Sequence, residues 1–283
     1  MAIVSQAVAA EKRLAKPIMS SLHGLWSVGA AGGSGVGALV TSLGIGFQAH
    51  LVTAAIVLAV LGPLTASALP SDPANAAGGS DEPAPKPPRF SLPTGTVPLI
   101  GFVAFGASFA EGSCTNWTAL YLNQVIHTSQ GLAAVGYAIF ACTMAATRLA
   151  GDRVVQHFGP VRTVRVGGLV AVVGGAIVVV SRAAPVSIGG FVLLGLGIAL
   201  VVPLSFSAAG HLGPQPAQAI AGMATVSYGS SLIAPAAVGA IASAASLPAA
   251  FTLITVLTAG IPLGARLTRS AEVTAVMPEP AAG

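Results

Sequence analysis

The fold is decided by a long stretch without charge, from Ala183 to Ala265, which begins AAPVSIGGFVLLGLGIALVVPLSFSAAG. It contains no Asp, Glu, Lys or Arg, and the stretch from Pro17 to Ser71 contains none either. A helix needs about 20 apolar residues to cross the hydrocarbon core of a membrane, so the longer stretch accommodates three or four crossings and the shorter one two. The sequence therefore predicts a membrane protein with several spans.

The composition of the chain excludes an ordinary soluble domain. Of its 283 residues, 54% are hydrophobic and 7% are charged, whereas about a quarter of the residues of a soluble domain are charged. The net charge of +4 does not indicate nucleic-acid binding, because the basic residues lie in short clusters beside apolar runs. Cys114 and Cys142 fall inside predicted spans and show no disulfide or metal-ligand spacing, so no metal or cofactor is expected.

Apolar blocks separated by turn residues predict an all-α bundle of about eight transmembrane helices, because a chain in lipid satisfies its backbone hydrogen bonds within each segment. The helices are expected near residues 19–44, 51–69, 97–122, 131–150, 163–181, 186–208, 217–243 and 248–266. The segment 70–96, rich in Pro and acidic residues, is expected to be a flexible cytoplasmic linker. The expected organisation is a cytoplasmic segment at 1–18, two spans within 19–69, the linker, six spans within 97–268 and a cytoplasmic tail at 269–283.

The distribution of Lys and Arg predicts the orientation of these spans. Eleven of the twelve basic residues fall on one side of the eight-span arrangement, and only Arg182 falls on the other. Because positive residues are retained on the cytoplasmic side of a membrane, both termini are expected to be cytoplasmic.

Glu111 is the only Asp, Glu, Lys or Arg between Phe90 and Thr147. An acidic residue inside a span is a functional candidate, because its burial is costly unless it faces a cavity or a partner. Ser108, Thr115 and Thr118 follow helical spacing relative to Glu111, which predicts a water-facing wall of a substrate or proton pathway. The structural alternative is a protonated Glu111 that is hydrogen-bonded to a neighbouring helix.

Two other polar residues in predicted spans have both a functional and a structural interpretation. His23, near one end of the first span, is either part of an aqueous proton path or an interfacial residue. Tyr228 lies among Gly and Ser in mid-span and either contacts substrate or forms a hydrogen bond across helices. In the first span, Gly29, Gly33 and Gly37 predict the close approach of another helix.

Charges return in the sequence TRLAGDRVVQHFGPVR at residues 147–162, which is expected to be a loop between the fourth and fifth spans. Asp152 can accept hydrogen bonds from the N-terminus of an adjoining helix and from Arg148 or Arg153, and the Gly-Pro pair predicts a tight turn. We expect Arg148, Gly151, Asp152 and Arg153 to form a charged latch at a cytoplasmic gate. Positive-inside anchoring is the alternative, and it explains only the arginines.

This motif, together with FAEGSCTNWTALYL upstream and IMSSLHGLWSVGA near the start, resembles the major facilitator superfamily, and within it bacterial inner-membrane carriers related to sugar-proton symporters. The resemblance implies a bundle of twelve helices in two halves, of which this chain corresponds to helices five to twelve and lacks the first four. It implies that Asp152 and Arg153 are the Asp and Arg of the loop motif of the second half, with Arg148 where that motif has a leading Gly. It also implies alternating-access transport of a small solute, such as a sugar or another polar metabolite, coupled to protons or another ion.

Two other functions compete with a carrier. Without four helices a central cavity lacks most of one wall, so the chain is either an incomplete reading frame or a non-transporting subunit that needs a helix-packing partner. The string Gly32–Gly35 places Ser34 in the GxSG pattern of intramembrane serine proteases, with His211 as a base. Such strings arise easily in a chain with 35 Gly, and His211 falls in a predicted loop, so no enzyme is expected.

Overall fold

The computed structural model describes residues 2–67, 95–212 and 215–271, and every regular element in these ranges is a helix. The prediction of an all-α protein is therefore confirmed. The described chain forms two units, residues 1–25 with 89–283, and residues 26–88. The predicted linker, apart from residues 95–96, and the predicted tail, apart from residues 269–271, lie outside the described residues.

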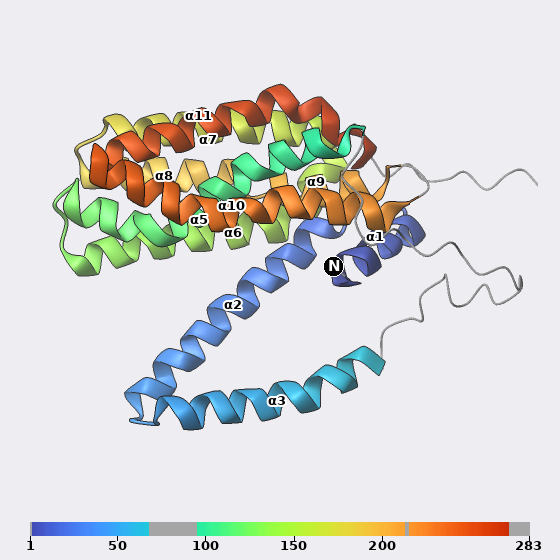
Figure 1. The fold of residues 1–283 in the computed structure, drawn as a ribbon, viewed down its shortest axis with the longest axis horizontal. Coiled ribbons are helices and arrows are strands. Elements are labelled where there is room, and N and C mark those ends of the chain that lie inside the picture. Colours follow the sequence, from blue (N-terminus) through green and yellow to red (C-terminus); the bar gives the residue numbers. More distant parts are fainter. Residues whose placement is uncertain (1, 68–94, 213–214, 272–283) are drawn as a thin grey trace, which may run out of the picture. The chain divides into compact units, whose positions relative to one another are not determined.

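The first unit contains a bundle of long helices (Figure 1). These are α5 (Val97–Gln124), α6 (Gln130–Phe158), α7 (Pro160–Val180), α8 (Ala184–Ile198) with α9 (Val201–Gly210), α10 (Pro216–Ala244), and α11 (Leu247–Gly264) with the 3₁₀ helix η1 (Ala265–Ala271). The unit also includes α1 (Ala2–Leu14) and the start of α2 (Met19–Ser42). The helix α1 was not among the predicted helices, and its residues fall within the segment 1–18 that was predicted to be cytoplasmic.

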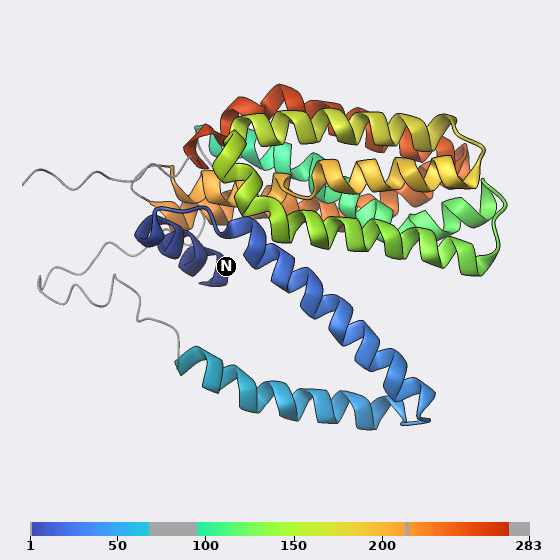
Figure 2. The same cartoon turned by 180° about the vertical axis from the view of Figure 1, so that it is seen from behind.

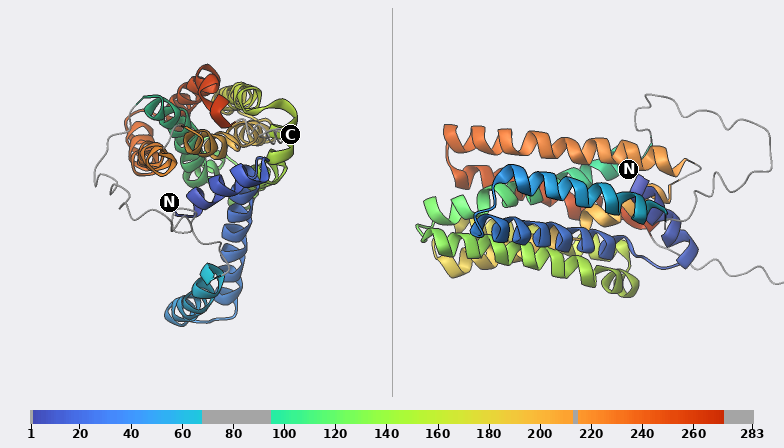
Figure 3. Two further views of the ribbon diagram at one scale, coloured as in Figure 1. Left: turned by 90° about the vertical axis from the view of Figure 1, so that its right-hand side faces the viewer. Right: turned by 90° about the horizontal axis from the view of Figure 1, so that it is seen from below.

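Within the bundle, α5 packs most extensively on α10, and α7 packs on both α8 and α11. Seen from behind, α8 lies between α6 and α7 (Figure 2). The view along the bundle shows these helices running roughly side by side around a shared interior (Figure 3, left). That interior is apolar and aromatic, with Tyr121, Phe191 and Phe251 in mutual edge-to-face contact at centroid distances of 4.8 to 5.9 Å.

Seven helices of the described chain are long and apolar enough to cross a membrane. They comprise α3 (Phe47–Ser67) and the six spans that begin at Val97, Gln130, Pro160, Ala184, Pro216 and Leu247. The helix α2 forms over the range predicted for the first span, but it is rich in Gly and Ser and is not among the seven. The seven helices without α2 are sufficient to make the chain a membrane protein with several helical spans.

The segment expected to be a loop after residue 150 is helical, so that prediction was wrong. The helix α6 continues to Phe158, because its sequence contains no helix-breaking residue before Gly159. Gly159 has φ of +76°, a conformation that side chains disfavour, and Pro160 occupies the first turn of α7. The tight turn predicted from the Gly-Pro pair is confirmed. We call the end of the bundle that carries this turn the Gly159 end.

The predicted span at 186–208 is also interrupted, between α8 and α9. Pro203 lies close to the start of α9 and cannot donate to the carbonyl of Ala199, four residues earlier. The break therefore leaves a backbone carbonyl available inside the bundle.

The second unit contains α2 beyond Leu25 and all of α3. The two helices are joined by a short turn in which Gly44 has φ of +71°, as is common just after a helix ends. Apolar side chains of α3 are exposed around the helix within the described structure, which is typical of a helix that faces lipid or other helices. Within this unit nothing lies within 4 Å of a Cβ added at Gly29, Gly33 or Gly37, so the close approach predicted there stays a prediction.

Close helix approach is observed instead between α7 and α8. A Cβ on Gly197 would lie 2.4 Å from the carbonyl oxygen of Gly167 and 2.5 Å from the backbone nitrogen of Ala171. Farther along the same pair of helices, a Cβ on Gly174 of α7 would lie 2.4 Å from the backbone nitrogen of Leu194 on α8. Backbone contact of this kind requires glycine and is a common mode of association between membrane helices.

Replacing Gly197 by Ala should therefore destabilise the bundle by about 1–3 kcal/mol, the usual cost of overpacking a close contact. Thermal unfolding in detergent micelles measures this. The matched control is Gly260→Ala in α11, where an added Cβ meets no atom within 4 Å and the change should leave stability equal or raise it slightly. Equal melting temperatures for the two variants would contradict the assigned α7–α8 contact.

Candidate functional site

The start of α2 is held by two buried or half-buried carboxylates, the first of which is Glu11 on α1. One of its oxygens, Oε1, accepts hydrogen bonds from the backbone N–H groups of Ile18 and Met19, each at 3.0 Å. Its other oxygen, Oε2, accepts a hydrogen bond of 2.6 Å from the hydroxyl of Ser207 on α9. Glu11 has no exposed surface. It therefore connects α1, the start of α2 and α9.

The second carboxylate is Asp152 on α6. Its Oδ1 accepts from the backbone N–H of Ser20 at 3.0 Å, and its Oδ2 accepts from that of Ser21 at 3.1 Å. Asp152 thus accepts hydrogen bonds from the N-terminus of an adjoining helix, which is one of the two pairings that the sequence allowed.

Together, Glu11 and Asp152 accept hydrogen bonds from four consecutive backbone amides at residues 18–21. The first amides of a helix have no partner within the helix, and the positive end of the helix dipole favours negative charge there. We call this arrangement of Glu11 and Asp152 the α2 clamp.

Gly151 makes the clamp sterically possible. A Cβ at this position would lie 2.4 Å from Cδ2 of Leu200 and 2.7 Å from Cβ of Ser20. Any larger residue would push the start of α2 away from α6 and lengthen the hydrogen bonds to Asp152. The sequence Gly151-Asp152 therefore combines a close helix contact with a capping carboxylate.

A second charged cluster lies deeper in the bundle and joins α5 to α6. Nη2 of Arg148 lies 2.7 Å from Oε2 of Glu111, and the side chains are 4% and 28% exposed. Nε of Arg148 donates to the carbonyl of Ala199 at 3.2 Å. That carbonyl is the one that Pro203 leaves without a helical donor. The break between α8 and α9 thus supplies an acceptor for a buried guanidinium.

Arg148 and Asp152 were predicted to form one latch, and the hydrogen bonds described above connect them to different helices. Both oxygens of Asp152 accept from the backbone of α2, and Arg148 donates to Glu111 and Ala199. Arg153 is exposed on α6. Gly151 and Asp152 lie together against the start of α2, and Arg148 contacts Glu111 on α5 and the carbonyl of Ala199.

The predicted polar stripe on α5 does not have one environment. Ser108 shares a hydrogen bond of 2.8 Å with Ser227 on α10, and Thr115 is exposed and donates to the carbonyl of Glu111. Thr118 has no exposed surface. The ion pair with Arg148, rather than a continuous polar wall, is what distinguishes Glu111 on this helix.

His23 is brought to the same cluster from the start of α2. Its Nδ1 lies 3.0 Å from the carbonyl of Met19, and its ring stacks on Phe206 at a centroid distance of 5.9 Å. The charges of Arg148 and Glu111 both act on it. The ring of Phe206 in turn lies 6.1 Å from that of Tyr228, whose side chain is 53% exposed.

Sequence reasoning missed two participants, Glu11 and Phe206. Glu11 stands in the charged run Glu11-Lys12-Arg13, which was interpreted as cytoplasmic anchoring. A usable signal existed, because Glu11 precedes Pro17 and a new helix start by only a few residues, where a carboxylate is favoured. No comparable signal marks Phe206, since its role depends on which helices pack together.

Removing the carboxylate in Glu111→Gln should destabilise the protein by about 3 kcal/mol, because it removes the carboxylate that is paired with the buried Arg148. The double variant with Arg148→Met should lose less than the sum of the two single losses, with a coupling of about 1.5 kcal/mol or more. Unfolding free energies in mixed micelles measure the cycle. The control Arg153→Met, an exposed arginine on the same helix, should change stability by no more than about 0.5 kcal/mol. Additive losses would show that the pair contributes nothing.

Comparison with known proteins agrees with this architecture. The family model of the Major Facilitator Superfamily matches residues 1–229. An uncharacterized transporter of Sinorhizobium fredii is 34% identical over 260 residues, covering 90% of this chain and 66% of that protein. An uncharacterized MFS-type transporter of Yersinia pestis is 36% identical over 262 residues, covering 92% and 66%.

The membrane protein MosC of Rhizobium meliloti is 30% identical over 159 residues, which cover 55% of this chain and 39% of that protein. The chain spans about two thirds of the length of the two transporters, 66% in each case. The family match, the two transporters and the helical bundle agree with one another, and the chain belongs to the major facilitator superfamily.

Proposed function

We propose that these helices belong to a secondary carrier that moves a small polar solute, such as a sugar, across the bacterial inner membrane by alternating access. Membership of a transporter family supports transmembrane transport in general. The observation that carries the proposal further is the ion pair between Glu111 and Arg148, because a charged pair inside a span is expected where a substrate or ion passes.

Glu111 is the proposed proton-coupling residue. It lies near the middle of α5 and is partly exposed, while its partner Arg148 is buried. A proton on Glu111 would remove the negative charge that faces Arg148 and would break the ion pair between α5 and α6. Protonation of Glu111 would in this way be coupled to a rearrangement of α5 and α6. His23 adds an ionisable ring that interacts electrostatically with both Arg148 and Glu111.

The α2 clamp is the proposed cytoplasmic gate. Four hydrogen bonds from residues 18–21 to Glu11 and Asp152 hold the start of α2 against α1, α6 and α9. Alternating access requires groups of helices to move relative to one another. We infer that the clamp is intact in the state described here and releases when the cytoplasmic side opens.

We further propose that both termini are cytoplasmic. Eleven of the twelve Lys and Arg were assigned to the cytoplasmic side from the sequence, and ten of them remain in that count once Arg148 is placed inside the bundle. In support, α1 carries Lys12 and Arg13 and packs on α9, which contacts η1 at the Gly159 end. Arg182 follows the opposite end of α7.

A non-transporting subunit that needs partner helices is the alternative function. The chain covers 66% of the length of the two related transporters, so transport by this chain is itself part of the proposal. The two functions differ in whether the purified chain alone moves solute across a bilayer.

The purified chain is placed in proteoliposomes with an alkaline interior that contains the pH-sensitive dye pyranine. When sugars and other polar metabolites are added outside one by one, a transported solute should enter with protons and acidify the interior. In Glu111→Gln this proton movement and solute accumulation should be abolished, because the amide cannot carry a proton, whereas exchange of labelled for unlabelled solute should persist. Glu111→Asp, which keeps the charge, is the matched control and should retain measurable accumulation.

Two outcomes would contradict parts of the proposal. Full accumulation by Glu111→Gln would remove Glu111 from the coupling mechanism. Absence of both accumulation and exchange with the unaltered chain would favour the non-transporting alternative over a carrier.

A further inference from the structure

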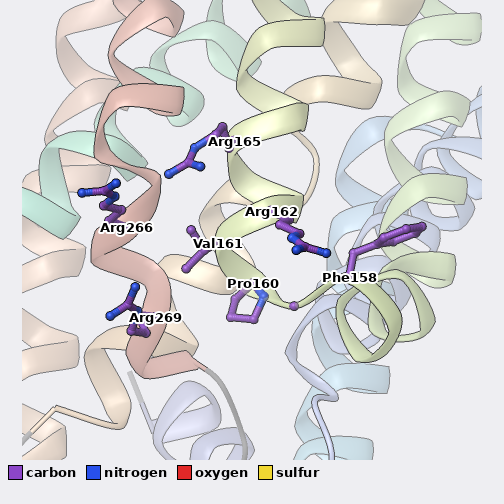
Figure 4. Close-up of a pocket in the computed structure, with 8 residues that line it drawn as sticks. Phe158, Pro160, Val161, Arg162, Arg165, Arg266 and Arg269 are labelled. Carbon is purple, nitrogen blue, oxygen red and sulfur yellow. The ribbon is translucent and has the colours of Figure 1, made fainter.

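Four arginines line a pocket of about 440 Å³ at the Gly159 end of the bundle (Figure 4). Arg162 and Arg165 come from the first turns of α7, and Arg266 and Arg269 come from η1. Arg165 extends from α7 toward the helix that carries Arg266 and Arg269 (Figure 4). The remaining lining residues are Phe158, Gly159, Pro160 and Val161.

The positive charge of this pocket is not neutralised within the described part of the chain. Among the described residues, the ion pair of Arg148 with Glu111 lies elsewhere in the bundle and involves none of the four pocket arginines. All four pocket arginines are exposed. Like charges that converge on one pocket repel one another unless an anion lies between them. Of the acidic residues close in sequence, Asp152 accepts from the start of α2, and Glu272 lies outside the described residues.

The backbone of α7 adds to the attraction for an anion. The helix starts at Pro160 beside the pocket, and no side chain caps its N-terminus. Amides of a first helical turn that lack a capping side chain, together with the positive end of the helix dipole, favour phosphate or carboxylate groups. Guanidinium groups bind phosphate oxygens in a fork geometry, so both features suit a phosphate.

Apolar side chains continue from the pocket toward the middle of the membrane. Val166 and Leu169 follow Arg162 and Arg165 by one helical turn on α7, and they are 59% and 54% exposed. On α11, Leu263 precedes Arg266 by three residues and is 85% exposed. A phosphate bound at the arginines would therefore lie directly beside an exposed apolar surface. A free phosphate makes no contact with such a surface, whereas the acyl chains of a phospholipid pack against it.

We propose that this pocket binds the phosphate headgroup of an anionic phospholipid, with its acyl chains along Val166, Leu169 and Leu263. The site is separate from the α2 clamp and from the pair of Glu111 and Arg148. Basic pockets at the cytoplasmic end of membrane helices are suited to anionic headgroups. The bound lipid would join α7 to η1 through the arginines that each helix contributes to the pocket.

The test uses the full chain, purified and stripped of lipid in detergent, and titrated with dioleoyl phosphatidylglycerol. Native mass spectrometry should show a saturable lipid adduct, and the melting temperature should rise. In Arg165→Gln/Arg266→Gln the apparent affinity should fall about 30-fold, which corresponds to about 2 kcal/mol and to the contribution of two arginines beside anionic lipid. Arg13→Gln/Lys16→Gln removes the same charge from exposed positions outside the pocket and should leave the affinity unchanged.

Three comparisons decide the outcome. Dioleoyl phosphatidylcholine should neither form the saturable adduct nor stabilise the chain, and inorganic phosphate at millimolar concentration should not reproduce the stabilisation. Arg165→Lys/Arg266→Lys keeps the charge and should retain most of the binding, and an unchanged melting temperature of the glutamine variant without lipid would show that its loss of binding is not misfolding. Equal binding by the glutamine variant and the unaltered chain, or equal stabilisation by inorganic phosphate, would overturn the proposal.

Discussion

The start of α2 is the point on which the arrangement of the surrounding helices depends. A helix that begins inside a packed bundle exposes amides without internal partners, and leaving them unpaired would cost more than an ordinary hydrogen bond contributes. Here two carboxylates from different helices supply the acceptors, with Glu11 also bonded to Ser207. The positions of α1, α6 and α9 are thereby linked through one helix terminus.

The pair of Arg148 and Glu111 follows a similar logic at a different depth. A guanidinium that is 4% exposed needs acceptors for its donors. One acceptor is the carboxylate of Glu111, and another is the carbonyl that Pro203 leaves free at Ala199. A proline in α9 and an acid in α5 therefore support one arginine in α6. Changing the charge of Glu111 would alter contacts among three helices at once, which is why we assign the coupling role to it.

Much of the fold was predictable from the sequence, because lipid imposes a strong constraint on composition and segment length. Long stretches without charge identified the helices, and the Gly159-Pro160 pair identified the turn between α6 and α7. The helix α6 was predicted to end too early, since the charged residues after 147 were interpreted as a loop although they are compatible with a helix.

The site was less predictable than the fold. Glu111 and Asp152 stood out because each is an acid beside apolar sequence, and the structure places both in specific contacts. Their partners could not be assigned, because helical spacing says which residues share a face of one helix and not which helices meet. Glu11 illustrates the difficulty: its sequence neighbours are basic and exposed, while its contacts are with Ser207 and the amides at 18 and 19.

The most direct test of the clamp is amide hydrogen exchange at residues 18–21, measured by mass spectrometry on the chain in detergent. If Asp152 and Glu11 hold these amides, exchange there should be slow, and it should accelerate at residues 20–21 in Asp152→Ala and at residues 18–19 in Glu11→Ala. Exchange at residues 18–21 that is fast in the unaltered chain, or unchanged in both variants, would contradict the clamp and the gate built on it.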